Sequence, residues 1–393
     1  MRPCFFIPMH PIYLDNHATT PLDPRVLRAM MPYLKGKFGN AASRTHLFGR
    51  ESRRGVEKAR AQVARLIGAE AREIVFTSGA TEANNLAIKG VVQARPGRGG
   101  RLLTVVTEHK SVLDPCKRLS LSGFRITALP VRRDGLVDLG KLKEAIRRDT
   151  VLISVMLANN EIGVIQPIAR MARIAKKRGI LFHCDAAQAV GKIPVNVKML
   201  GVDLMSFTAH KLYGPKGVGA LYVRKKGEPQ VRLVPLLDGG GHEVGLRSGT
   251  LNVAGIVGFG EACEIARRGL AAELRKLARL RDRLRDGILR GVPDAVVNGS
   301  EKNRLPNNLN VSLPGVRAEA LMKKIPNVAV SSGSACLSTS PVPSHVLRAL
   351  GMRDELARCA IRFGIGRFNT TAEMDSVIRK VVSAVKRLRS RAA

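Results

Sequence analysis

Short apolar runs and helical patterns alternate along residues 73–225, and this alternation restricts the chain to very few fold classes. The apolar runs that suit strands are 73–78, 101–109, 151–160, 180–188, 202–211 and 217–225. The helical patterns between them are 79–94, 110–120 and 168–179. Strands and helices that take turns in this way predict an α/β fold with a mostly parallel, doubly wound sheet. Ligands of such sheets bind beyond the carboxyl ends of the strands.

From about residue 265 the pattern changes to long charged helices. The apolar residues that recur at helical spacing there are Leu270, Leu274, Leu277, Leu280, Leu284 and Ile288. Thr370 and Glu373 have the spacing of a capping box at the start of a last helix. With the strand-like residues 307–314, these helices predict a second, smaller α+β domain. The expected domains are a large one over 15–264 and a small one formed by 1–14 and 265–393.

The composition bounds the class of protein. The chain has 393 residues, enough for about two or three domains' worth of globular structure. No apolar run approaches the roughly 18 to 20 residues that a membrane span needs, and the opening residues lack the long apolar region of a signal peptide. We therefore expect a cytoplasmic protein without a membrane partner. The six cysteines include no C-x-x-C pair, so neither a disulfide framework nor a metal site is expected.

Cys336 differs from the other five cysteines because it lies in a run of serine, glycine and threonine. Serine hydroxyls compete for backbone hydrogen bonds, Gly333 relaxes the backbone, and two following prolines prevent a helix. We therefore predict a mobile surface loop over about 331–343. Order should resume at a short helix that Ser344 caps and Gly351 ends. A thiol on such a loop is interpreted as a group that must move from one position to another.

Polar residues follow the predicted strands one after another. Residues 78–81 turn from a strand into a helix, and the free N–H groups and dipole of that helix suit an anion. Asp185 follows an apolar strand, where a carboxylate needs a positive partner. Lys211 ends another strand 26 residues later. Together these features match pyridoxal phosphate, which takes a lysine as Schiff-base partner and an acid at its ring nitrogen.

Ten motifs spread from Ile12 to about residue 388 carry a resemblance to a known family. They are "YLDNHATTPLDPRV", "FGNAASRTH", "IVFTSGATEANNLAIKG", "TEHKSVL", "NNEIGVIQPI", "HCDAAQAVGK", "DLMSFTAHKLYGPKGVGALYVR", "GGGHEVGLRSGTLNV", "VSSGSACLSTS" and "IRFGIGRFNT". In combination they resemble the group I cysteine desulfurases of the class-V aminotransferase family. That family supplies sulfur for iron–sulfur clusters and tRNA thiolation.

The resemblance implies a fold-type I pyridoxal-phosphate enzyme and a homodimer whose active sites lie at the subunit interface. It implies that Lys211 is the Schiff-base lysine and that Asp185 pairs with the pyridine nitrogen. His109 would stack on the ring and handle protons on the substrate, and Gln188 would contact the ring hydroxyl. Cys336 would be the nucleophile that takes the substrate sulfur as a persulfide.

The resemblance also assigns the phosphate and the substrate. Ala80, Thr81, Thr208 and His210 would bind the cofactor at its phosphate end, joined by Thr250 of the partner subunit.

Asn160, which also adjoins the cofactor, and Arg362 would receive the carboxylate of L-cysteine, Arg362 as a planar bidentate donor. Alanine would leave, and the persulfide would pass to a sulfur-acceptor protein, such as an iron–sulfur scaffold, or to a tRNA-thiolation partner.

The charge is a separate signal. Basic residues outnumber acidic ones by 66 to 31, a net charge of +35. The excess is concentrated in 44–65 with seven basic and two acidic residues, 267–290 with nine and three, and 375–391 with six and one. Solvated faces usually carry both signs in comparable numbers. We therefore hypothesise an acidic partner, and favour a protein over a tRNA because aromatic residues are only 4% of the chain.

Two alternative interpretations of the sequence are open. A selenocysteine lyase or another aminotransferase-like enzyme of fold-type I would keep Lys211 and Asp185 but has no need of Cys336 on a long loop. A catalytically inactive, basic nucleic-acid-binding protein would explain the charge, but it would not need the complete set of cofactor residues.

Overall fold

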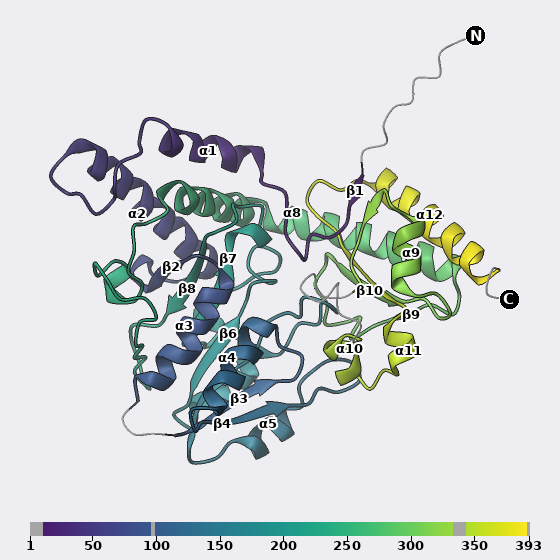
Figure 1. Cartoon of the computed structure of the whole chain (residues 1–393), viewed down its shortest axis with the longest axis horizontal. Helices are drawn as coiled ribbons and strands as arrows, with labels where there is room; N and C mark the ends of the chain where they lie inside the picture. The colour runs from purple at the N-terminus through teal and green to yellow at the C-terminus, as the bar shows by residue number, and fades with distance from the viewer. Residues whose placement is uncertain (1–10, 96–98, 333–342, 391–393) are drawn as a thin grey trace, which may run out of the picture.

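The computed structural model describes residues 11–95, 99–332 and 343–390, and these form two parts joined by one long helix (Figure 1). Within them, the larger part is built on a seven-stranded sheet and the smaller part on a three-stranded and a two-stranded sheet. Most of the loop predicted at about 331–343, Cys336 included, lies outside the described residues.

The seven-stranded sheet has the strand order β2-β8-β7-β6-β5-β3-β4. Its strands are β2 (Ile74–Thr77), β3 (Arg101–Val105), β4 (Arg125–Leu129), β5 (Thr150–Ser154), β6 (Leu181–Asp185), β7 (Leu204–Thr208) and β8 (Gly219–Val223). β8 runs antiparallel to both of its neighbours, and all other neighbouring pairs are parallel. The predicted α/β fold with a mostly parallel sheet is confirmed.

Helices cover both faces of this sheet because successive residues of each strand point to opposite sides. Val75 packs in the hydrophobic cluster beneath α3 and α4, whereas its neighbours Ile74 and Phe76 pack in the cluster beneath α2 and α6. The helices of this part are α1 (Pro24–Leu34), α2 (Leu47–Ile67), α3 (Ala80–Gln93), α4 (Lys110–Ser120), α5 (Leu139–Ala145), α6 (Ile168–Lys176) and α7 (Val197–Leu200). Three short 3-10 turns add η1 (Ala71–Glu73), η2 (Ala209–Lys211) and η3 (Glu243–Gly245).

The long helix α8 (Val253–Gly291) connects the two parts. Its residues up to Ala266 pack in the core of the large sheet, and from Leu277 onward its buried residues belong to the second core. The helix crosses the predicted boundary at 264/265 without a break, so the two parts share one rigid element. The division into domains there stays a prediction.

The smaller part holds the second core between its sheets and helices. Its strands are β1 (Ile12–Tyr13), β9 (Val296–Val297), β10 (Asn308–Ser312), β11 (Val328–Ala329) and β12 (Ala360–Gly364), and its helices are α9 (Ala318–Lys324), α10 (His345–Ala349), α11 (Asp354–Ala357) and α12 (Thr371–Arg389). The three-stranded sheet, β12-β10-β9, is antiparallel, and β1 pairs with β11 in parallel. Figure 1 shows α12 beside α8 over this part.

Several strands end earlier than the apolar runs predicted. β7 ends at Thr208, so Lys211 lies in the turn η2 and not, as predicted, at a strand end. β3 ends at Val105 and β5 at Ser154, so His109 and Asn160 lie in the loops that follow. His109 instead caps α4, because its Nδ1 accepts the N–H of Ser111 at 3.1 Å. The apolar residues that follow Ser154 are buried although they lie outside the strand, so burial rather than strand pairing explains their apolar character.

Several local predictions are confirmed. The capping box of Thr370 and Glu373 starts α12, and Ser344 caps α10. The four cysteines of the described residues are buried free thiols: Cys116, Cys184, Cys263 and Cys359. None of the helices in the described ranges is both long and apolar enough to cross a membrane.

Candidate active site

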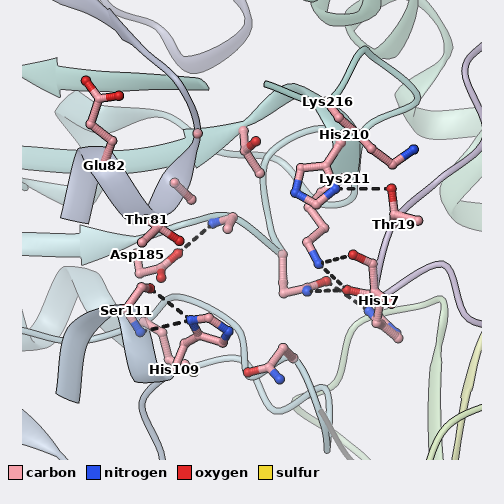
Figure 2. A pocket seen from close by; sticks show the side chains of 18 of the residues that line it. His17, Thr19, Thr81, Glu82, His109, Ser111, Asp185, His210, Lys211 and Lys216 are labelled. Atoms are coloured by element: carbon pink, nitrogen blue, oxygen red, sulfur yellow. Dashed lines mark hydrogen bonds between the residues drawn. The ribbon is translucent and has the colours of Figure 1, made fainter. Parts of the chain in front are cut away.

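A cavity of about 520 Å³ opens at the carboxyl ends of the parallel strands (Figure 2). Ten of the residues singled out in the sequence line it: Ala80, Thr81, His109, Asn160, Asp185, Gln188, Thr208, His210, Lys211 and Arg362. Thr250 is exposed and does not line this cavity, and Cys336 lies outside the described residues. The position of the cavity follows from the sheet, because the βα loops converge at that edge.

The N-terminus of α3 lies on the cavity wall and is suited to an anion. The first N–H groups of a helix have no partner inside the helix, and the dipole makes that end positive. A side chain on Gly79, just before the helix, would lie 3.9 Å from Thr208 Oγ1, so strand β7 brings the threonine to the same turn. A Cβ on Gly219 would come within 2.7 Å of the Gly79 Cα atom. Only glycine therefore lets β8 approach this turn so closely.

His210 adds a neutral ring near this end. Burial, followed by the nearby lysines Lys211, Lys216 and Lys192, lowers the pKa of His210 to about 4. Its Nδ1 lies 3.2 Å from Thr19 Oγ1 (Figure 2). The imidazole is thus uncharged at neutral pH and can donate or accept a hydrogen bond without adding charge.

The amine of Lys211 is held by main-chain oxygens. Its Nζ donates to the carbonyl of Ala18 at 2.7 Å and to that of His17, as Figure 2 shows. Two hydrogen bonds hold the His17 ring in place. Its Nδ1 donates to Gln188 Oε1 at 2.9 Å, since an amide oxygen can only accept. Its Nε2 accepts from Asn308 Nδ2 at 3.2 Å. Burial holds the pKa of His17 well below its ordinary value. A neutral, rigid His17 therefore orients the carbonyl that holds Lys211.

Asp185 and His109 are joined by a network on the other side of the cavity. The carboxylate of Asp185 accepts from Ala187 N at 2.9 Å and from Asn84 Nδ2 at 2.8 Å. Asn84 also donates to Ser111 Oγ at 2.8 Å, and Ser111 Oγ lies 2.9 Å from His109 Nδ1. Because Nδ1 accepts the Ser111 N–H, a neutral His109 carries its proton on Nε2. Burial lowers the pKa of His109, although the negative charge of Asp185 acts to raise it.

Arg362 also lines the cavity and is only 1% exposed. Its Nη2 pairs with Asp15 Oδ1 at 2.7 Å, and its Nη1 donates to the Asn160 carbonyl at 2.9 Å. Its Nε–H has no partner among the described residues. A buried guanidinium with an unpaired donor on a cavity wall is suited to a carboxylate ligand.

The donor set fits pyridoxal phosphate. The helix N-terminus with Thr208 suits the phosphate, Asp185 suits a protonated ring nitrogen, and the amine of Lys211 can reach an aldehyde in the same cavity. The start of α3 and Arg362 line the same cavity of about 520 Å³.

Three residues that sequence reasoning did not assign complete the site: Asn84, Ser111 and His17. Asn84 lies four residues after Ala80 on the same face of α3, so helical spacing could have identified it. His17 and Ser111 gave no such signal, because their roles depend on contacts with Gln188 and Asn84 from distant parts of the chain.

Glu161, next to Asn160, gives a prediction about stability. Burial raises the pKa of its carboxyl from 4.5 to about 7, against the opposing effects of Ser344 and Arg362. Between these pH values the folded state binds the proton more tightly than the unfolded chain, so stability falls as pH rises. Glutamine cannot ionise. The free energy of unfolding of Glu161→Gln, relative to that of the parent, should therefore rise by about 1–3 kcal/mol as the pH increases from 4.5 to about 7.

Urea unfolding of parent and variant at several pH values measures this difference. A difference in unfolding free energy that stays constant with pH would contradict the prediction.

Comparison with known proteins adds an independent finding. The sequence model of the aminotransferase class-V family matches residues 12–377. The protein described as cysteine desulfurase IscS of Anaeromyxobacter sp. (strain Fw109-5) is 56% identical over 379 residues, which cover 96% of this chain and 93% of that protein.

Two solved structures are similar as well. A NifS-like protein superposes with a TM-score of 0.89 at 40% identity, covering 96% of this chain and 99% of that one. A structure described as SspA in complex with cysteine has a TM-score of 0.80 at 36% identity, covering 91% of this chain and 100% of that one.

Proposed function

The chain belongs to the aminotransferase class-V family and, within it, to the cysteine desulfurases, and from this premise we propose how its own residues carry out the reaction. The enzyme removes sulfur from L-cysteine and leaves L-alanine. The proposal for its residues is supported by one observation above all. Lys211, Asp185, the N-terminus of α3 and Arg362 surround a single cavity.

The proposed cofactor is pyridoxal phosphate. When bound, it supplies a conjugated ring that takes up the electrons released at the substrate's α-carbon. The N–H groups at the start of α3 would hold its phosphate, beside the hydroxyl of Thr208, which donates to the Val218 carbonyl at 3.1 Å. Asp185, oriented by Asn84, would accept a hydrogen bond from the protonated ring nitrogen and so keep it protonated. Lys211 would be the covalent attachment point for the aldehyde, and its amine would move the proton at the substrate's α-carbon.

L-Cysteine binds with its carboxylate on Arg362 and Asn160. The Cys336 thiolate then attacks the substrate sulfur: an S–S bond forms on Cys336 while the carbon–sulfur bond of the substrate breaks. The electron pair of that bond stays on carbon, which takes a proton. Cysteine and the enzyme thiol thus become alanine and an enzyme persulfide, with no outside oxidant or reductant. A neutral His109, which lines the same cavity, carries its proton on Nε2.

The test is direct. The purified protein should show the visible absorbance of a lysine-bound cofactor, and with L-cysteine and a reducing thiol it should release alanine and sulfide in equal amounts. Release of alanine from selenocysteine alone would favour the selenocysteine lyase alternative. Absence of bound cofactor after reconstitution would favour the inactive nucleic-acid-binding alternative, which the complete set of cavity residues opposes.

We further propose a homodimer, in which Thr250 of the partner subunit completes the phosphate site. Thr250 is exposed in the single chain, and Arg247 of the same segment pairs with Glu82 beside the start of α3 at 3.0 Å. A cytoplasmic location is supported by the free thiols among the described residues, since reducing compartments keep cysteines unpaired.

The proposed sulfur acceptor is an acidic protein, and the surface that attracts it is an arginine cluster at and just before the start of α2. We define this cluster as Arg44, Arg50, Arg53 and Arg54. With Glu57, these residues line a hollow of about 390 Å³. Among the described residues, none of the four arginines forms an ion pair. Unpaired guanidinium groups gathered in a hollow create a field that favours a negatively charged partner.

Charge reversal in this cluster should slow sulfur transfer. Arg53→Glu with Arg54→Glu is expected to lower persulfide transfer to an acidic acceptor protein about tenfold at low salt, since electrostatic steering is worth that much or more. The effect should shrink at physiological salt because the field is screened. Alanine formation from cysteine alone should not change.

The matched control is Lys176→Glu with Lys177→Glu at the end of α6, which makes the same change of charge at another exposed place. Persulfide transfer that is equally slow in both double variants, or whose rate does not change with salt concentration, would show that the cluster does not attract the acceptor.

A further inference from the structure

Glu82 is an unexpected residue for the wall of a cavity suited to an anion. It lies in the first turn of α3, beside Thr81, and it lines the same cavity (Figure 2). Burial acts to raise the pKa of its carboxyl, but hydrogen bonds from Ser78 and Arg247 outweigh burial and lower that pKa below its ordinary value. Glu82 is therefore ionised at neutral pH. A negative charge beside the first N–H groups of a helix opposes the binding of a phosphate there.

Two contacts hold the Glu82 carboxylate. Its Oε2 accepts the N–H of Ser78 at 2.8 Å, and its Oε1 accepts from Nε of Arg247 at 3.0 Å. The side chains of Glu82 and Arg247 are only 15% and 21% exposed, so salt and water screen this pair less than a surface pair. Among the described residues, Arg247 is the one cation that pairs with Glu82. The ion pair therefore cancels the charge of Glu82 beside the start of α3.

The loop that carries Arg247 is anchored to strand β2. The buried carboxylate of Glu243 accepts from both Nη atoms of Arg60 at 2.7 Å, and it also accepts the N–H of Phe76 at 2.7 Å. Glu243 and Val244 have φ angles of 52° and 58°, a left-handed backbone that residues other than glycine rarely adopt. Such strain persists only where the surrounding structure holds it. Because β2 leads directly into the turn before α3, this loop and the start of α3 are supported by the same strand.

We propose that Arg247 is a positioning residue for the cofactor phosphate: it neutralises Glu82, so that the N–H groups at the start of α3 attract the phosphate without an opposing charge. This rests on the proposed binding of pyridoxal phosphate in the cavity. Arg247 does not line the cavity itself and acts through Glu82. The two charges should therefore compensate each other, so that removing both restores the affinity that is lost when the positive one alone is removed.

The test measures cofactor affinity rather than activity. The full-length protein is dialysed to equilibrium against graded concentrations of pyridoxal phosphate, and the visible absorbance reports the bound fraction. Arg247→Met removes the charge but keeps a long side chain, and it should weaken binding about tenfold. Glu82→Gln keeps an acceptor for the Ser78 N–H, and it should strengthen binding about threefold. The double variant should bind within about threefold of the parent.

Pyridoxal, which lacks the phosphate, is the matched control ligand. Its affinity should stay within about twofold of the parent value in all three variants, since the proposed effect acts on the phosphate. A parallel loss of pyridoxal binding in Arg247→Met would overturn the proposal, because Arg247 would then support the whole cavity. A double variant that binds as weakly as Arg247→Met would overturn it too, because Arg247 would then act without Glu82. An unchanged affinity for pyridoxal phosphate in Arg247→Met would also contradict it.

If Arg247→Met does not fold, Glu82→Gln tests the same charge balance. With Glu82 uncharged, Arg247 adds an unopposed positive charge near the phosphate, so only pyridoxal phosphate should bind more tightly. Weaker or unchanged binding of pyridoxal phosphate by this variant would refute the proposed role of Arg247. Failure of the proposed function has a different result: the parent protein itself would show no saturable visible absorbance with pyridoxal phosphate.

Discussion

Lys211→Ala is expected to abolish covalent attachment of pyridoxal phosphate and to lower alanine formation from cysteine roughly 10⁴-fold or more. Lys211 ends the short turn η2 that follows β7, and its amine is held by the carbonyls of Ala18 and His17 on the cavity wall. An alanine there removes the amine that would supply both the covalent bond and the movable proton. Borohydride reduction of the parent, followed by peptide mapping, should find the cofactor on Lys211.

Lys216→Ala is the matched control, because Lys216 lines the same cavity and carries the same charge. It should weaken cofactor binding at most and leave the covalent label on Lys211. The fully buried Lys192, whose pKa burial lowers to about 7, is the competing amine. A label on Lys192 or Lys216 would refute the assignment.

Cys336→Ser is expected to bind cofactor and cysteine like the parent but to form no protein persulfide, with alanine formation reduced roughly 10³-fold or more. A hydroxyl is a poor acceptor for sulfur, and a serine cannot be deprotonated at neutral pH. Mass spectrometry of the protein after one turnover detects the added sulfur atom. The four described cysteines are buried, and burial raises the pKa of Cys116 to about 12, so they offer no reactive thiolate.

Cys359→Ser provides the control, since the serine hydroxyl can keep the hydrogen bond that the Cys359 thiol donates to the Glu355 carbonyl at 3.3 Å. This variant should form persulfide at the parent rate. Persulfide in Cys336→Ser, or its loss in Cys359→Ser, would move the nucleophile to another residue.

Much of this protein could be predicted from local pattern. The buried strands and the turn at Ala80 can be predicted from short stretches of sequence, because the periodicity of strands and helices involves residues that are close in the chain. The carboxyl ends of parallel strands meet at one edge, so Asp185 and Lys211 could be predicted to lie together. The true ends of β3 and β5 could not be predicted, since apolar residues continue past the last ladder bonds into buried loops.

What the sequence alone determined is the α/β class, the order of its elements and the chemical residues at the strand ends. What only the tertiary structure decided is which distant groups meet. Arg362 pairs with Asp15 across 347 residues, and Ser344 with Glu161 across 183. The reason is physical: such contacts form only when segments far apart in the chain pack together, as the residues after β1 do with β12. No local periodicity encodes the separation or orientation of two such segments.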